Sequence, residues 1–93
     1  MAAPNYVFKK TLQFRRAFSA LSPAEKTLAE KAFKVFKANP FDPSLKPHKI
    51  NRLSSLHKRT VHSISIAADL RVVFIIKENI VFSLDIGSHD IYK

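Results

Sequence analysis

Helical and strand-like hydrophobic patterns occupy separate parts of this sequence. In the stretch 11–38 apolar residues recur at helical spacing, whereas from Val61 onward they alternate or form short runs rich in β-branched residues. Helices and strands that are segregated along a chain are typical of α+β domains, in which the helices cover one face of an antiparallel sheet. The pattern therefore predicts an α+β fold with an N-terminal strand and a helical hairpin packed on a small twisted antiparallel sheet.

Local signals set the expected helix boundaries. A short apolar run at 5–9 precedes any helical periodicity and predicts a first strand, and a first helix is expected from Thr11 to Leu21. The sequence Ser22-Pro23-Ala24-Glu25 then has the residues of a capping box, with proline at the first helical position. Asn39-Pro40 should end this second helix, because proline disfavours helical backbone in the residue before it.

The second half of the chain predicts three strands that follow a stiff loop. Prolines at 40, 43 and 47 favour an extended segment over 41–47. The runs 61–66, 70–77 and 80–86 are expected to form an antiparallel meander. Within the last run the alternation predicts that the hairpin covers Ile80, Phe82, Leu84 and Ile86, which leaves the other face of the sheet open, with polar groups toward its end.

Charge and length bound the possible functions. Residues 1–93 are expected to form a single domain, since a second core needs a longer chain. Sixteen Lys and Arg against seven Asp and Glu give a net charge of +9, which favours nucleic acid, an acidic protein or a membrane surface as partner, although basic small proteins also occur for solubility alone. No signal-peptide-like or membrane-spanning segment is evident, so a cytoplasmic protein without membrane association is expected.

The available side chains suit metal-free chemistry on RNA. The chain lacks cysteine, its four histidines do not have zinc-ligand spacing, and its single glycine cannot make a phosphate-binding loop, so neither a metal nor another cofactor is expected. Cleavage of RNA by its own 2′-hydroxyl needs a base, an acid and cations near the phosphate. Convergence at one end of the sheet is expected for His48, Asp69, Arg71 and His89, whereas His57 is interpreted as a solvated loop residue and His62 as a partly buried one at the sheet edge.

The order of segments resembles one toxin superfamily over nearly the whole chain. The segments are Asn39-Pro40, Pro43-Ser44-Leu45, His48-Lys49-Ile50, Ser63-Ile64-Ser65-Ile66, Asp69-Leu70-Arg71-Val72-Val73-Phe74 and Asp85-Ile86-Gly87-Ser88-His89-Asp90-Ile91-Tyr92. Together they resemble the RelE/ParE superfamily, and most of all its branch of YafQ-like messenger-RNA interferases. The resemblance implies a type II toxin, a metal-independent endoribonuclease that acts on messenger RNA in the ribosome and is silenced by a cognate acidic antitoxin.

The resemblance also implies roles for individual residues. His48 matches the loop histidine, Asp69 the acidic residue that begins the middle strand, Arg71 the basic residue two positions later and His89 the C-terminal histidine. Tyr92 approximates the terminal aromatic, one position closer to the histidine than is usual. Contacts to RNA phosphates are expected from Arg71, Lys49, Arg52, Lys58 and Arg59.

Two departures and two alternatives accompany this interpretation. Ser65 stands where many relatives carry Arg or His, and Arg52 replaces a glycine that is usual after the loop histidine, so a weakened enzyme or a binding protein is one alternative. The ParE branch uses the same scaffold to inhibit DNA gyrase without catalysis, and a fold alone does not choose between these functions. The pair His48 and His89 favours RNA.

Overall fold

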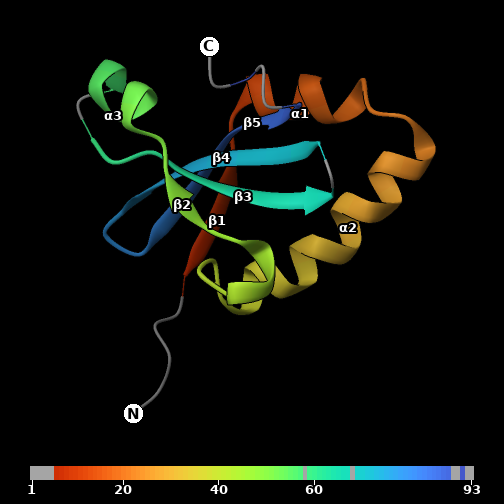
Figure 1. Cartoon of the computed structure of the whole chain (residues 1–93), viewed down its shortest axis with the longest axis horizontal. Helices are drawn as coiled ribbons and strands as arrows, with labels where there is room; N and C mark the ends of the chain where they lie inside the picture. Colours follow the sequence, from red (N-terminus) through yellow and green to blue (C-terminus); the bar gives the residue numbers. More distant parts are fainter. Residues whose placement is uncertain (1–5, 58, 68, 89–90, 92–93) are drawn as a thin grey trace.

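The computed structural model describes residues 6–57, 59–67, 69–88 and 91, apart from the side chains of residues 56 and 57. The elements follow one another along the chain as shown in Figure 1. They are β1 (Val7–Lys10), α1 (Leu12–Ser19), α2 (Pro23–Ala38), the 3₁₀ helix η1 (Pro43–Leu45), β2 (His48–Lys49), α3 (Asn51–His57), β3 (His62–Ala67), β4 (Leu70–Lys77) and β5 (Ile80–Gly87).

A single mixed sheet organises the molecule. Its strand order is β1-β5-β4-β3-β2, in which β1 pairs with β5 in parallel and all other pairs are antiparallel. The predicted α+β class and the antiparallel meander of β3, β4 and β5 are confirmed. The sheet is nevertheless larger than expected, because the N-terminal strand joins it as a parallel edge strand and the loop after η1 adds the short strand β2.

The two N-terminal helices begin where the sequence predicts, and α2 also ends there, whereas α1 ends at Ser19, two residues before Leu21. Thr11 caps α1 by accepting a hydrogen bond from the Phe14 backbone N–H at 3.1 Å. Ser22 and Glu25 form the reciprocal capping box at the start of α2, at 3.0 and 3.1 Å. Helix α2 ends at Ala38, before Asn39-Pro40. None of the helices built from described residues is long and apolar enough to cross a membrane.

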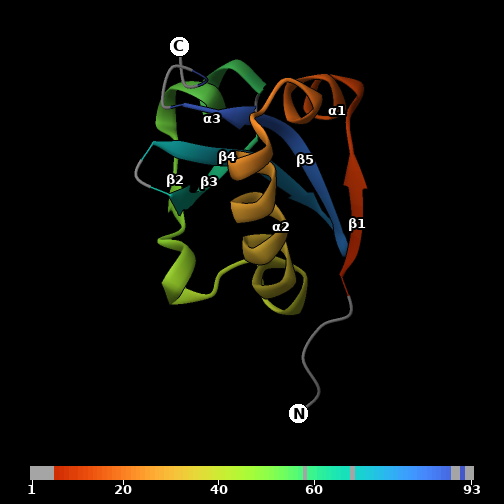
Figure 2. The same ribbon diagram turned by 90° about the vertical axis from the view of Figure 1, so that its right-hand side faces the viewer.

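The main core lies between the helical hairpin and one face of the sheet. Figure 2 shows α2 in front of the sheet, with α1 and β1 beside each other at its edge. Phe14 of α1, Phe36 of α2 and Phe74 of β4 are each at most 2% exposed, and the rings of Phe36 and Phe74 meet edge to face with centroids 5.0 Å apart. On β4 the side chains of Leu70, Val72, Phe74 and Ile76 all belong to or pack against this core.

On β5 the predicted face is wrong for most of the strand. The pairs Val73↔Asp85 and Phe74↔Ser83 leave Leu84 as an extra residue, and this β-bulge reverses the alternation. Val81 is therefore fully buried in the main core, whereas Phe82 lies opposite Ile75 on the other face. Only Ile86, beyond the bulge, faces the hairpin as predicted.

A small second core closes part of the face that was expected to be open. Leu53, Val61 and Val73 are buried there, with Ile50 and Ile91 packed against them. Leu53 comes from α3, a helix that the sequence did not predict, so the backbone of His57 ends a helix where a loop was expected. What remains open on this face is the end of the sheet where β3 ends and β4 begins.

Candidate functional site

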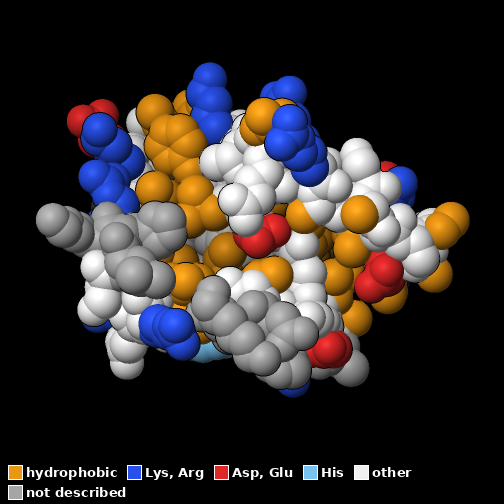
Figure 3. All heavy atoms as spheres, turned by 90° about the horizontal axis from the view of Figure 1, so that it is seen from above, with side chains coloured by type: hydrophobic (Ala, Val, Ile, Leu, Met, Phe, Trp, Pro, Cys, Tyr) orange, Lys and Arg blue, Asp and Glu red, His pale blue; other side chains and the backbone are white. Residues whose placement is uncertain are grey.

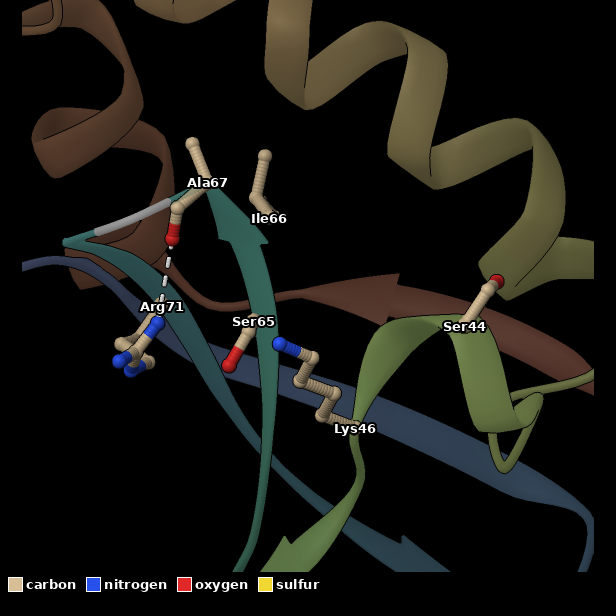
Figure 4. A pocket seen from close by; sticks show the side chains of 6 residues that line it. All are labelled: Ser44, Lys46, Ser65, Ile66, Ala67 and Arg71. Atoms are coloured by element: carbon tan, nitrogen blue, oxygen red, sulfur yellow. Dashed lines mark hydrogen bonds between the residues drawn. The ribbon is translucent and has the colours of Figure 1, made fainter.

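A basic hollow of about 350 Å³ lies at this open end of the sheet. Figure 4 shows its six described lining residues, which come from η1, the residue that follows it, the end of β3 and the start of β4. They are Ser44, Lys46, Ser65, Ile66, Ala67 and Arg71. Two of the six are cations and none is acidic, so the hollow offers positive charge and hydroxyl groups to a ligand.

The loop before β2 fixes the position of Lys46. The segment 41–47, predicted to be extended, forms a 3₁₀ turn because the Asp42 carboxylate accepts hydrogen bonds from the Ser44 N–H and hydroxyl, at 2.9 and 2.7 Å. These hydrogen bonds lower the pKa of Asp42. Leu45 is 4% exposed and anchors the turn in the main core. Lys46 follows in the left-handed backbone conformation, with φ 50° and ψ 53°, and its side chain extends toward Ser65 (Figure 4).

Arg71 reaches the hollow from β4. It lies directly opposite Ser65 of β3, and its guanidinium donates a hydrogen bond from Nη1 to the Ala67 carbonyl at 3.2 Å. That carbonyl is available because a bulge between Ser65 and Ala67 distorts the end of β3. Ser65 thus stands between an arginine held by the backbone and a lysine held by a turn (Figure 4).

His48 lies on the same face, one row along the sheet. The strand register places His48, Ser63, Val73 and Asp85 opposite one another, next to the row that contains Ser65 and Arg71. Neighbouring rows on one face are two residues apart, or about 7 Å. The His48 ring is exposed, with Nδ1 3.2 Å from the Lys46 carbonyl oxygen, and does not itself line the hollow.

The other predicted site residues are not gathered at this hollow. Asp69 is exposed in the turn between β3 and β4 and is not among the lining residues. Lys49 pairs with His62, whose ring stacks on Phe74 of the main core, so it lies on the hairpin side of the sheet. Arg52 and Arg59 are exposed in and after α3. Lys58, His89 and Tyr92 lie outside the described residues.

His62 is confirmed as a partly buried histidine. Its ring packs against Phe74 and Phe41, with centroids 5.3 and 5.1 Å away. Burial, with a smaller effect of the nearby Lys49 charge, lowers the pKa of His62. Because it lies on the face away from the hollow, His62 is a poor proton carrier for a ligand bound there.

Ile91, beyond the end of β5, lies at the same end of the sheet. A Cβ atom on Gly87 would lie 2.9 Å from Ile91 Cγ2, so glycine allows Ile91 to pack over the end of β5. The register places Gly87 in the row of Ser65 and Arg71. Among the described residues no group of three or more His, Cys, Asp or Glu could hold a metal ion.

Lys46 is the main contributor that sequence reasoning missed. Its position depends on the left-handed residue that follows the 3₁₀ turn, and a lysine before a proline carries no signal of that conformation. The Asp42-Pro43-Ser44 sequence, which resembles a helix start, was the available indication that the segment turns. Seen from the end that carries α1 and α3, Lys and Arg side chains also flank a patch of hydrophobic ones (Figure 3).

Comparison with known proteins places the architecture. Neither protein-family sequence models nor curated protein sequences give a match. Among solved structures, YafQ from E. coli is similar with a TM-score of 0.72 at 9% identity, over 92% of this chain and 96% of that one. A RelE–RelB complex from Pyrococcus horikoshii is similar with a TM-score of 0.69 at 13% identity, over 90% and 94%. A metal-bound toxin from Helicobacter pylori has a TM-score of 0.62 at 20% identity, over 91% and 96%. The chain has the fold of these toxins.

Proposed function

We propose that this chain, which has the fold of the YafQ and RelE toxins, is the toxin of a type II toxin–antitoxin system and cleaves messenger RNA without a metal ion. The observation that carries the proposal is the basic hollow, in which Lys46 and Arg71 flank Ser65 at the open end of the sheet. Two cations that converge on one space can hold a phosphodiester and stabilise the charge that develops on it. The ribosome is the proposed place of action and the cytoplasm the proposed compartment.

The proposed reaction is attack by the RNA 2′-oxygen on the adjacent phosphorus, with cleavage of the bond between phosphorus and the 5′-oxygen. One group accepts the 2′-hydroxyl proton and another donates a proton to the departing 5′-oxygen. Arg71 and Lys46 would hold the phosphate oxygens. His48, one row away, is proposed for proton transfer or substrate contact. The resemblance suggests His89 and Asp69 for acid and base work and Tyr92 for stacking on a base.

The position of Lys46 bears on whether a serine at position 65 leaves the site short of a cation. A serine at position 65 removes the cation that many relatives carry there, and this favours a weakened enzyme or a binding-only protein. In this chain, however, the side chain of Lys46 extends toward Ser65 from the neighbouring turn. We infer that Lys46 supplies the missing positive charge, so that cleavage activity is retained.

An antitoxin is the proposed protein partner. Solved structures of similar fold include complexes named RelE–RelB and DinJ–YafQ, in which a toxin is bound to its antitoxin. The net charge of +9 on this chain makes an acidic partner electrostatically favourable. Messenger RNA and the ribosome, both polyanions, are the other proposed partners.

Controlled expression in a bacterial host tests the proposal. We expect the wild-type chain to arrest growth and to generate new 5′ ends within messenger RNA, and Arg71→Ala to do neither while accumulating as a folded protein. Arg15→Ala is the matched control, because it removes an exposed arginine of α1 that lies away from the hollow. Growth arrest with intact transcripts and damaged DNA would favour the gyrase alternative, and the absence of growth arrest would contradict the toxin proposal.

A further inference from the structure

The basic hollow has a second wall that the proposed phosphate contacts leave unused. The hollow exists because β2 pairs with β3 only at His62 and Ser63, so the chain before β2 turns away and leaves the end of β3 uncovered on that side. Across this gap stands the 3₁₀ turn η1, whose Ser44 lines the hollow. Figure 4 shows Ser44 on the opposite side of the hollow from Arg71, with the Lys46 side chain between them.

The lining of the hollow has a cationic part and an apolar part. Lys46 and Arg71 offer only hydrogen-bond donors, and they are the groups proposed to hold the RNA phosphate. Ile66 and Ala67 add apolar surface and pack against the main core. The volume of about 350 Å³ lies within the usual range of small-molecule sites, about 300–1,000 Å³. The hollow therefore has room for a base beside the phosphate.

The hydroxyl of Ser44 is restricted to one role. It donates its proton to the Asp42 carboxylate at 2.7 Å, and the same carboxylate oxygen accepts the Ser44 N–H at 2.9 Å. Because these hydrogen bonds lower the pKa of Asp42, the carboxylate stays ionised and keeps accepting this proton at neutral pH. A hydroxyl has one hydrogen and two lone pairs, so Ser44 Oγ can only accept a hydrogen bond from a ligand in the hollow.

Ser44 is therefore the side chain of this lining that can discriminate between bases. No hydrogen bond among the described residues fixes the hydroxyl of Ser65, which can turn either to donate or to accept. Lys46 and Arg71 donate to any acceptor on a base or a phosphate. Ser44 Oγ, in contrast, attracts an N–H donor and repels a carbonyl oxygen, and the negative charge of Asp42 beside it strengthens both effects.

We propose that Ser44 selects the base that lies beside the bound phosphate, by accepting a hydrogen bond from the exocyclic amino group of adenine or cytosine. At the corresponding positions uracil and guanine present a carbonyl oxygen, and two acceptors that face each other leave both without a hydrogen bond. The inference rests on the proposed function, because it takes Lys46 and Arg71 as the phosphate site. It adds a residue that determines where a message is cleaved.

Binding of RNA analogues that cannot be cleaved tests the proposal on the full chain. The probes are four labelled 2′-O-methyl hexamers, made of adenosine, of purine riboside, which lacks only the amino group, of cytidine and of uridine. We expect the adenosine hexamer to bind about two- to tenfold more tightly than the purine riboside hexamer, which is the effect of one hydrogen bond. The cytidine hexamer should exceed the uridine hexamer by at least as much. Equal affinities within either pair would overturn the proposal.

Substitution of Ser44 locates the source of the preference. Alanine keeps the backbone N–H that donates to Asp42, so Ser44→Ala should leave Tm unchanged while the preference disappears from both pairs. Ser44→Thr keeps the hydroxyl and should keep the preference. Ser55→Ala, which removes an exposed serine of α3 outside the hollow, is the matched control and should behave as the wild type. A Ser44→Ala variant with wild-type Tm and the full preference would overturn the role of Ser44.

Salt dependence separates the base from the phosphates. The four hexamers carry the same phosphates, so every affinity should fall with salt concentration while the ratio within each pair stays constant. Lys46→Ala combined with Arg71→Ala should weaken all four hexamers. A preference that disappears at high salt would overturn the proposal, because it would assign the difference to the phosphates.

Cleavage of unmodified RNA distinguishes failure of this inference from failure of the proposed function. Intact RNA, together with a preference that depends on Ser44, would refute the cleavage but leave base recognition standing. Cleavage that is lost with Arg71→Ala but is indifferent to the base in both the wild type and Ser44→Ala would refute the inference alone. Absence of binding by all four hexamers to the folded wild type would overturn both.

Discussion

Replacing Lys46 with glycine should make the protein more stable and its RNA binding weaker. Lys46 is a non-glycine residue with φ 50° and ψ 53°, a conformation that costs about 1–2 kcal/mol for residues with a Cβ. Glycine relieves this cost but gives back about 0.4–1 kcal/mol through the greater entropy of the unfolded chain. The expected net gain in the free energy of unfolding is therefore about 0.5–1 kcal/mol, the difference between these two effects.

The gain in stability translates into a measurable shift in Tm. At about 2.1 cal/mol/K per residue, the 93 residues have an unfolding entropy near 0.2 kcal/mol/K, so Tm should rise by about 3–5 °C. For RNA binding, loss of one phosphate contact lowers the slope of log affinity against log salt concentration by about 0.7, which amounts to roughly fivefold in affinity at 0.1 M salt. Thermal melting and salt titrations with a short single-stranded RNA measure the two effects.

Glu78→Gly is the matched control for this prediction. Glu78 also has a positive φ, 58°, but lies in the turn between β4 and β5, away from the hollow. We expect Glu78→Gly to raise Tm without any loss of RNA affinity. If Lys46→Gly leaves both the affinity and the salt slope at wild-type values, Lys46 does not contact RNA phosphate and the assignment of the hollow is wrong.

Three further predictions concern the core, the partly buried His62 and the C-terminal His89. Phe74→Ala removes a ring with no exposed surface and should lower the free energy of unfolding by about 3–5 kcal/mol. Phe82→Ala, on the opposite face of the sheet, should lower it distinctly less in the same denaturation experiment. Equal losses would contradict the bulge at Leu84. Because the pKa of His62 is lowered in the folded state, the free energy of unfolding should be highest above the ordinary histidine pKa of about 6.5 and fall as the pH drops below it. His62→Phe should remove this decline. If urea unfolding gives the same pH profile for the variant as for the wild type, His62 is not its cause. His89→Ala should reduce RNA cleavage by about 10²- to 10⁴-fold without changing Tm, and full cleavage by this variant would exclude histidine 89 as the acid or base.

Local rules determined much of this fold, and they failed where the register changes. The capping box at Ser22 and Glu25, the stop at Asn39-Pro40 and the full extent of β4 follow from nearest neighbours in the sequence. The inward face of β5 could not be predicted, since the bulge at Leu84 depends on pairing with β4 and reverses an alternation that the sequence displays clearly. The parallel pairing of β1 with β5 joins residues more than 70 positions apart and left no local signal.

In the candidate site, too, some residues could be identified from the sequence and others only from the structure. The resemblance singled out Arg71 and Ser65 in the sequence, and their cross-strand pairing follows from the predicted meander. Lys46 could not, because its position depends on a left-handed residue after an unpredicted 3₁₀ turn. Lys49 and Arg71 are both basic residues of the sheet, yet they lie on opposite faces, and composition alone does not separate them.

The chemistry of the RNA ends tests the central claim most directly. Purified protein should be incubated with ribosomes that are translating a defined message, and with the same RNA alone in the presence of EDTA, and both ends of every product should be identified. Attack by the 2′-oxygen predicts 2′,3′-cyclic phosphate and 5′-hydroxyl ends in whichever reaction cleaves the RNA, and no products with Arg71→Ala. Products with 5′-phosphate ends, or intact RNA in both reactions with a folded wild-type protein, would contradict the account.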